Sequence, residues 1–329
     1  MAKRAVLLLA HGTPGRVDEI PEYLRNVVSG RPMPQHVVEE IQHRYSLIGD
    51  PRGHSPLTEL TLEQGELLRL ELARNPVRAG EEIPVYVGMR NWKPYIADVV
   101  KQMRADGVEE AVVICLAPQN SRTSVGLYRR AALAEAAGMR LDFLHDWADE
   151  PLLAEAFAER LRPAYRKLAS ETDGPVAVLF TAHSVPCRTI QTPAASEGQP
   201  QLWPSGGVPD PYPVEAKLTA QLVAERVPEI GAWHFAFQSQ GASGGPWIGP
   251  AVQDTLDALA AGGAKAVVLQ PIGFLCDHVE ILYDIDIDFR QHAAKLGMRL
   301  ERPESLNGSP ALTQALAKLA REGLARLAG

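Results

Sequence analysis

The stretch "AVLLLAHGTP", residues 5–14, is a short apolar run that ends in a histidine and a Gly-Thr-Pro turn. An apolar segment bounded by turn residues predicts a strand buried on both faces, as in a parallel sheet. The run is too short for a secretory signal, and no apolar run in the chain reaches the roughly 18 residues of a membrane span. We therefore predict that residues 5–11 form the first strand of an α/β protein without an integral membrane segment, and we expect it in the cytoplasm.

Strands and helices are predicted to alternate along the rest of the chain. Apolar runs predict further strands at 85–89, 111–118, 176–183, 233–238 and 266–274, and helical spacing of apolar residues occurs at 35–45, 95–107 and 251–263. This alternation predicts parallel sheets covered by helices. Residues 188–211 are rich in Pro, Gly, Gln and Ser and predict a surface loop. Trp203 in this loop either packs on the loop itself or closes over a ligand.

The predicted strand ends occur in pairs. Stretches in the first half resemble stretches in the second half: 7–14 and 179–186, 85–92 and 233–240, 109–121 and 264–278. This pseudo-repeat predicts two Rossmann-like, doubly wound domains with parallel sheets, one over residues 1–160 and one over residues 161–329. Ligands of such sheets bind beyond the carboxyl ends of the strands, so we expect a cleft between the domains, near His11 and His183.

Composition excludes several classes of protein. The formal net charge of -7 and the pI of about 5.8 disfavour a nucleic-acid partner, because such proteins usually carry a basic face. The three cysteines are scattered and form no CxxC pair, which disfavours a disulfide framework, a zinc finger and an iron–sulfur cluster. No GxGxxG, GxxxxGK[ST] or GxSxG motif occurs, so nucleotide binding and serine hydrolase chemistry have no local support.

The stretch "FLCDHVEILYDIDIDF", residues 274–289, interleaves carboxylates with apolar side chains. If it is helical, Glu280, Asp284 and Asp288 share one face, and a π-type widening would align them further. The period of two in "DIDIDF" leaves a strand open for its tail, and a solvated acidic face stays an alternative. Together with an imidazole such as His183, these carboxylates suit Fe(II), Zn(II) or Co(II) in transit.

Other side chains at predicted strand ends and loops could bind a ligand. His183 and His11 each could be a metal ligand, a base or only a strand cap. Arg44, Tyr45 and Ser55 lie in a loop able to bind a ligand carboxylate. Tyr128 precedes Arg129 and Arg130. These three residues could contact a ligand, or they could form a basic helix face exposed to solvent.

Eight stretches together resemble the ferrochelatases over nearly the full length of the chain. They are "LLLAHGTP" (7–14), "HRYSLIGDPRGHSPL" (43–57), "VYVGMRNWKPYI" (85–96), "LAPQNSRTSVGLY" (116–128), "TAHSVP" (181–186), "DPYP" (210–213), "FQSQGASGGPWIGP" (237–250) and "PIGFLCDHVEILYDIDIDF" (271–289). The resemblance is greatest to the soluble, Gram-positive type that uses coproporphyrin III. It implies two Rossmann-like domains and insertion of Fe(II), as substrate, into a porphyrin.

The resemblance also implies roles for single residues. His183 of "AHS" and Glu280 of "DHxE" would contact the metal and accept the pyrrole protons. Asp284 and Asp288 would extend an acidic track outward, which could hold a second divalent cation. The porphyrin-binding candidates are His11, Arg31, Arg44, Tyr45, Ser55 and Tyr128. Family members that use coproporphyrin III often have Tyr at the position of His11, so His11 is a candidate axial ligand of the product iron. Unlike some members, this chain lacks the cysteines for an iron–sulfur cluster.

Several readings of the substrate and partners stay open. Coproporphyrin III is favoured because its four propionates match the polar candidates, and protoporphyrin IX is the first alternative. "LLLAHGT" alone also resembles the chelatases that insert cobalt or iron into sirohydrochlorin, and a non-catalytic haem or porphyrin carrier would show the same binding features. The expected partners are the porphyrin substrate, the haem product, and an iron donor or a downstream enzyme of the haem pathway. We expect a monomer.

Overall fold

The computed structural model of the chain describes residues 2–49, 53–78, 80–190, 209–241 and 245–328, and these form two compact units. The described residues up to Trp147 and from Asn307 onward make the first unit, and those between Ala148 and Leu306 make the second. None of the helices in these ranges combines the length and the apolar character that crossing a membrane requires. The two units are described separately below.

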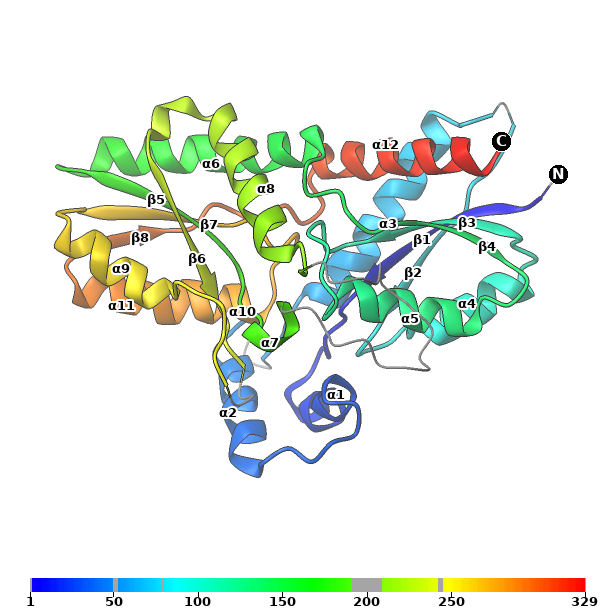
Figure 1. The fold of residues 1–329 in the computed structure, drawn as a ribbon, viewed down its shortest axis with the longest axis horizontal. Helices are drawn as coiled ribbons and strands as arrows, with labels where there is room; N and C mark the ends of the chain where they lie inside the picture. Colours follow the sequence, from blue (N-terminus) through cyan, green and yellow to red (C-terminus); the bar gives the residue numbers. More distant parts are fainter. Residues whose placement is uncertain (1, 50–52, 79, 191–208, 242–244, 329) are drawn as a thin grey trace. The chain divides into compact units, whose positions relative to one another are not determined.

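The first unit is built on a four-stranded parallel sheet in the order β2-β1-β3-β4. Its strands are β1 (Arg4–Ala10), β2 (Val85–Met89), β3 (Glu110–Cys115) and β4 (Arg140–Leu144). Its helices are η1 (Val17–Glu19), α1 (Ile20–Val27), α2 (Gln35–Ser46), α3 (Leu57–Arg74), α4 (Ile96–Ala105), α5 (Val125–Glu135) and α12 (Pro310–Leu327). Helices α4 and α5 cover one face of the sheet, and α3 and α12 cover the other (Figure 1).

Successive side chains of the central strands point to opposite faces of the sheet, and apolar residues occupy both faces. Val113 of β3 belongs to the core cluster that packs under α4 and α5. Its neighbour Val112 meets α12 at Gly323, where an added Cβ would lie 2.7 Å from the valine methyl groups. The helix can therefore approach the sheet this closely only because residue 323 is glycine. Both faces being buried explains why β1 and β3 are continuous apolar runs.

The second unit repeats this plan with the strand order β6-β5-β7-β8, again all parallel. Its strands are β5 (Val176–His183), β6 (Trp233–Gln238), β7 (Ala266–Pro271) and β8 (Arg299–Glu301). Its helices are α6 (Pro151–Glu171), α7 (Cys187–Ile190), α8 (Tyr212–Arg226), η2 (Pro228–Ile230), α9 (Val252–Ala261), α10 (Val279–Leu282), the π-helix η3 (Asp284–Phe289) and α11 (Arg290–Lys295). Helices α6 and α8 cover one face, and α9 to α11 with η3 cover the other (Figure 1).

The α/β class and the two parallel sheets confirm the sequence prediction, whereas the chain divides elsewhere than at residue 160. That position falls inside α6, which packs against α8 and the second sheet. Helix α12 packs against α3 and β3 and so belongs to the first unit. Helical periodicity shows that a segment has an apolar face but not which sheet that face will cover. The predicted cleft between the domains stays a prediction.

Two further differences concern strands and loops. Strands β4, "RLDFL", and β8, "RLE", were not predicted, because edge strands are short and partly polar. The stretch 284–289 is a π-helix, so its alternating pattern does not mark a strand. Most of the predicted loop 188–211, including Trp203, lies outside the described residues.

Candidate functional site

His183 is the last residue of β5, at the carboxyl edge of the second sheet, opposite Gln238 of β6. Its backbone oxygen accepts a hydrogen bond of 2.8 Å from the Tyr212 hydroxyl. Its ring Nδ1 donates to the backbone oxygen of Ser184. A carbonyl oxygen can only accept, so Nδ1 carries a hydrogen and Nε2 is the ring nitrogen left for chemistry.

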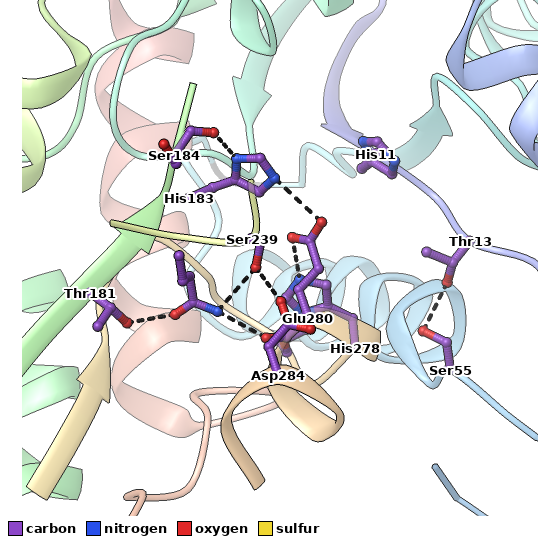
Figure 2. Close-up of polar contacts among 12 residues, drawn as sticks. His11, Thr13, Ser55, Thr181, His183, Ser184, Ser239, His278, Glu280 and Asp284 are labelled. Carbon is purple, nitrogen blue, oxygen red and sulfur yellow. Dashed lines mark hydrogen bonds and ion pairs between the residues drawn. The ribbon is translucent and has the colours of Figure 1, made fainter. Parts of the chain in front are cut away.

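The carboxylate of Glu280 faces that nitrogen (Figure 2). Glu280 lies in the first turn of α10, and its Oε1 is 3.3 Å from His183 Nε2. Each of the two side chains is 34% exposed, so the pair can be reached from outside while much of it is shielded from water. The structure thus brings together the two residues that the sequence singled out for chemistry.

A second imidazole, which the sequence analysis did not single out, contacts the same carboxylate. His278 Nε2 lies 3.5 Å from Glu280 Oε2, and His278 Nδ1 donates to the backbone oxygen of Cys276 at 3.0 Å. The ring of Phe274 lies beside both imidazoles, with centroid distances of 6.4 Å to His183 and 4.6 Å to His278. The signal that could have found His278 is its place in "DHVE", two residues before Glu280.

Opposite charges dominate the protonation of this cluster. Burial disfavours a charged His183, but the Glu280 carboxylate and hydrogen bonds to Glu280 and Ser184 outweigh it and raise the pKa of His183 above its ordinary value. Burial likewise disfavours a charged Glu280, but the charge of His183 and hydrogen bonds from both histidines hold the pKa of Glu280 well below its usual range. At a pH below this raised pKa of His183, the pair is imidazolium and carboxylate, and one proton lies between Nε2 and Oε1.

We expect the Glu280→Gln variant to lower the pKa of His183. Without the carboxylate, only the hydrogen bond to Ser184 and the charge of Asp284 still oppose the effect of burial, so the imidazole loses its proton at a lower pH than in the unchanged protein. NMR titration of the imidazole Cε1–H, assigned by its loss in a His183→Gln variant, measures this. The Glu304→Gln variant, altered at an exposed carboxylate, should titrate like the unchanged protein. An identical His183 titration curve in the Glu280→Gln variant would contradict the charge pairing.

Hydrogen bonds from β5 and β6 hold the start of this helical segment in place. The Gln238 side chain accepts from Thr181 Oγ1 at 2.7 Å and donates to the backbone oxygen of Glu280 at 2.9 Å. The next residue, Ser239, has a φ of +61° and donates from Oγ to Asp284 Oδ2 at 2.5 Å (Figure 2). The motif "FQS" therefore links the strand edge to both Glu280 and Asp284.

The carboxylates of residues 274–289 divide into two sets. Arg302 pairs with Asp277 at 3.2 Å and with Asp286 at 2.7 Å. Glu280 and Asp284 lie near the imidazoles and Ser239, and Asp288 accepts from Gln253 Nε2 at 3.4 Å. Asp284 is buried, whereas Asp288 is exposed. The i, i+4, i+8 series thus passes from a half-buried carboxylate to solvent along the predicted π-type widening.

In the first unit, His11 follows the end of β1. Its Nε2 lies 2.8 Å from the Tyr23 hydroxyl, and Asn91 Nδ2 lies 3.2 Å from the ring nitrogens. His11 is partly exposed, while Asn91 and Tyr23 are buried. Any ligand that uses Nε2 of His11 must therefore replace its bond to Tyr23.

The other predicted porphyrin-binding residues also lie in the first unit but differ in exposure. Tyr45 and Tyr128 are buried, and buried Ser55 accepts a hydrogen bond of 3.2 Å from Thr13 Oγ1. Arg31 is exposed, and Arg44, which is partly exposed, pairs with Glu40. The two arginines therefore carry the charge that a ligand could reach more readily than the three buried hydroxyls.

The donor atoms of the cluster suit a borderline divalent cation, because imidazole nitrogens and carboxylate oxygens are ligands of Fe(II). In the described ranges, no three His, Cys, Asp or Glu side chains surround a common point that would hold a metal ion. Instead, Glu280 turns its two oxygens toward two imidazoles.

The fold matches solved structures of chelatases. Sirohydrochlorin chelatase SirB of Bacillus subtilis with Fe3+ superposes with a TM-score of 0.59 at 13% identity, over 99% of this chain and 98% of that chain. The enzyme from B. subtilis subspecies spizizenii in complex with cobalt gives a TM-score of 0.54 at 11% identity, over 98% and 95%. The fold is therefore that of the tetrapyrrole chelatases.

Sequence comparison gives the family within this class. The Ferrochelatase family model matches residues 3–324. The ferrochelatase of Acidobacterium capsulatum is 61% identical over 99% of this chain and 96% of its own length. The coproporphyrin III ferrochelatase of a Geobacillus species is 35% identical over 96% of both chains. The chain belongs to the ferrochelatase family and inserts Fe(II) into a porphyrin for haem synthesis.

Proposed function

We propose that this ferrochelatase converts coproporphyrin III and Fe(II) to coproheme, with His183 and Glu280 as the residues that contact the metal and accept protons. The observation that carries the proposal is the 3.3 Å pair of His183 Nε2 and Glu280 Oε1 at the carboxyl edge of a parallel sheet. Ligands bind at this edge in open α/β sheets. We also propose that the protein acts as a monomer in the cytoplasm and meets an iron donor or a downstream enzyme of the haem pathway.

The proton balance explains why such a pair is useful. The free porphyrin carries two pyrrole N–H groups, so binding of Fe2+ releases two protons and leaves the porphyrin–iron unit without a change in net charge. Glu280 is ionised and can accept a proton, while His183 must lose its Nε2 proton before that nitrogen can bind a cation. Approach of the cation and departure of protons are therefore coupled at these two atoms.

The acidic track gives the released protons and the incoming metal a route. Asp284 is buried and receives the Ser239 hydroxyl, and Asp288 is exposed one turn further along the helix. Carboxylates exchange both protons and hard or borderline cations. We propose that Asp284 and Asp288 pass metal inward or protons outward and that this track holds a second divalent cation.

The choice of coproporphyrin III rests on charge and on relatives. This substrate carries four propionates, which cationic and polar groups such as Arg31, Arg44, Ser55, Tyr45 and Tyr128 would bind. The buried hydroxyls could contribute only if binding uncovers them, so the two arginines are the stronger candidates. Several coproporphyrin III ferrochelatases are 33–35% identical over nearly the full chain, while the 61% identical relative carries only the broader name.

An anaerobic insertion assay tests the substrate. With Fe(II) and equal concentrations of each tetrapyrrole, we expect kcat/KM to be highest for coproporphyrin III, lower for protoporphyrin IX and near background for sirohydrochlorin. Coproporphyrin III presents four propionates to the arginines, protoporphyrin IX presents only two, and sirohydrochlorin is a partly reduced ring with eight carboxylates. Heat-denatured protein gives the background rate. A higher kcat/KM for protoporphyrin IX would overturn the substrate proposal, and binding of coproporphyrin III without insertion would favour a carrier.

We propose His11 as the axial ligand of the product iron. Its imidazole is partly exposed, and an iron–nitrogen bond at Nε2 would replace the contacts that this nitrogen makes with Tyr23 and Asn91. In the His11→Ala variant loaded with coproheme, we expect the absorption and resonance Raman bands that report an iron–histidine bond to be lost. The His36→Ala variant, altered at an exposed histidine of α2, should keep them. Unchanged ligation bands in the His11→Ala variant would exclude this role.

A further inference from the structure

Arg302 joins the two ends of the segment that carries Glu280. Its Nε and Nη2 donate to the two carboxylate oxygens of Asp286 at 2.8 and 2.7 Å, and its Nη1 lies 3.2 Å from Asp277 Oδ1. Ser305 Oγ donates to the same Asp277 oxygen at 2.7 Å. Asp277 lies three residues before Glu280, ahead of the start of α10, and Asp286 lies in the π-helix that follows it. The guanidinium of Arg302 therefore pairs with one carboxylate before Glu280 and with one carboxylate after it.

The ion pairs of Arg302 restrict the positions of Asp277 and Asp286 relative to β8. The Arg302 side chain is only 11% exposed, and both carboxylates are 21% exposed, so the ion pairs are shielded from water. The fork of an arginine on a carboxylate specifies orientation as well as distance, which a lysine cannot reproduce. Arg302 follows β8, so the fork ties the π-helix to the edge strand of the sheet.

The segment itself does not favour this conformation. A π-helix is rare and less stable than an α-helix, and η3 places Asp284, Asp286 and Asp288 within six residues. Like charges this close repel one another through space unless a cation offsets them. Pairing of Asp286 and Asp277 with Arg302 removes two of the five carboxylates of residues 274–289 from this repulsion.

We propose that Arg302 is a positioning residue for metal insertion: its fork on Asp286 and its contact with Asp277 hold residues 277–286 so that Glu280 lies opposite His183. The inference rests on the proposed role of Glu280. Arg302 touches neither reactant and acts only through the segment that it fixes. A displacement of about 1 Å at a reacting group can lower a rate up to roughly 100-fold, so release of this clamp should slow the chemical step.

The test must separate positioning from stability, because removing one member of a buried ion pair leaves an unpaired charge and destabilises the fold. Three variants do so. Arg302→Met removes the guanidinium alone, Arg302→Lys keeps the charge without the fork, and the triple variant Arg302→Met, Asp277→Asn, Asp286→Asn removes all three charges together. Arg299→Met, three residues earlier and paired with exposed Glu171, is the matched control.

The readouts are kcat for Fe(II) insertion, the porphyrin Kd from fluorescence quenching, and circular dichroism, all at a temperature where every variant is folded. We expect kcat to fall about 10- to 100-fold in both the lysine and the triple variants. The porphyrin Kd should stay within about twofold of that of the unchanged protein, because the binding energy of the ring is left in place. The Arg299→Met control should keep both values.

A kcat near that of the unchanged protein in either the lysine or the triple variant would overturn the inference, since the fork is absent in both. A Kd that weakens in step with kcat would also overturn it, because it would indicate a general loss of structure. The Glu280→Gln variant, assayed in parallel, separates this failure from failure of the proposed function. If that variant inserts iron normally, the role of Glu280 is wrong; if it is inactive while the Arg302 variants are active, only the positioning role is wrong.

Discussion

The Glu280→Gln variant should insert iron about 10²- to 10⁴-fold more slowly than the unchanged protein, which is the range for losing a positioned proton acceptor. Glutamine keeps the size of the side chain and one acceptor oxygen, but its second polar group is a donor and it cannot accept a proton from a pyrrole nitrogen at neutral pH. It also removes the negative charge that faces both imidazoles at 3.3 and 3.5 Å. Initial rates of anaerobic Fe(II) insertion into coproporphyrin III, followed by absorbance, measure the loss.

Binding of the porphyrin should change little in this variant, because the side chain keeps its shape and the residues proposed to bind the propionates lie elsewhere in the chain. Fluorescence quenching by the protein gives the Kd. The matched control is Glu304→Gln, which alters an exposed carboxylate paired with Arg160 and should leave the rate unchanged. A rate in the Glu280→Gln variant equal to that of this control would remove Glu280 from the chemistry.

The second expected result concerns His183. The His183→Gln variant should lose a comparable factor of about 10²- to 10⁴-fold, because it removes the nitrogen that shares a proton with Glu280 and that is proposed to contact the metal. The double variant with Glu280→Gln should be about as slow as the slower single variant. Residues that act as one unit give non-additive losses, since either removal already disables the unit.

The same insertion assay on all three variants measures this coupling. His234, exposed on β6 of the same sheet, supplies the matched control as His234→Gln, whose rate should be unchanged. Losses that multiply in the double variant would mean that His183 and Glu280 act independently. The account of a shared proton would then be wrong even if each residue were needed.

Much of the chemistry could be predicted from the sequence because it depends on residues near one another in the chain or at strand ends. His183 and Glu280 were expected together, and the structure places them in contact. Carboxylates spaced by four share one face of any helix, and the sequence analysis noted that a π-type widening would align them further while a strand stayed open for the tail; residues 284–289 form a π-helix. His278 was missed although it lies in the same motif, because an imidazole two residues before a glutamate points to no contact until the backbone conformation is known.

The porphyrin-binding residues of the first unit stay a prediction. Tyr45, Ser55 and Tyr128 have the polar groups that a propionate would need, yet all three are buried. Whether a tyrosine faces solvent or the core depends on the helices packed against it, which the local sequence does not specify. Arg31 is exposed and Arg44 is partly exposed, because arginine is among the residue types that are hardest to bury.

The sequence by itself determined the α/β class, the pairs of strand ends, the ferrochelatase family and the two candidate residues, His183 and Glu280, that the structure brings into contact, because strand and helix periods and short motifs are local properties. Only the tertiary structure decided where α12 packs, which edge strands complete the sheets, and which carboxylates Arg302 removes from the acidic series. The packing of α12, the pairing of the edge strands and the ion pairs of Arg302 all depend on contacts between segments that are far apart in the sequence. These contacts are favoured by the burial of apolar surface between the packed segments and by the pairing of opposite charges, and neither can be evaluated before the chain is folded.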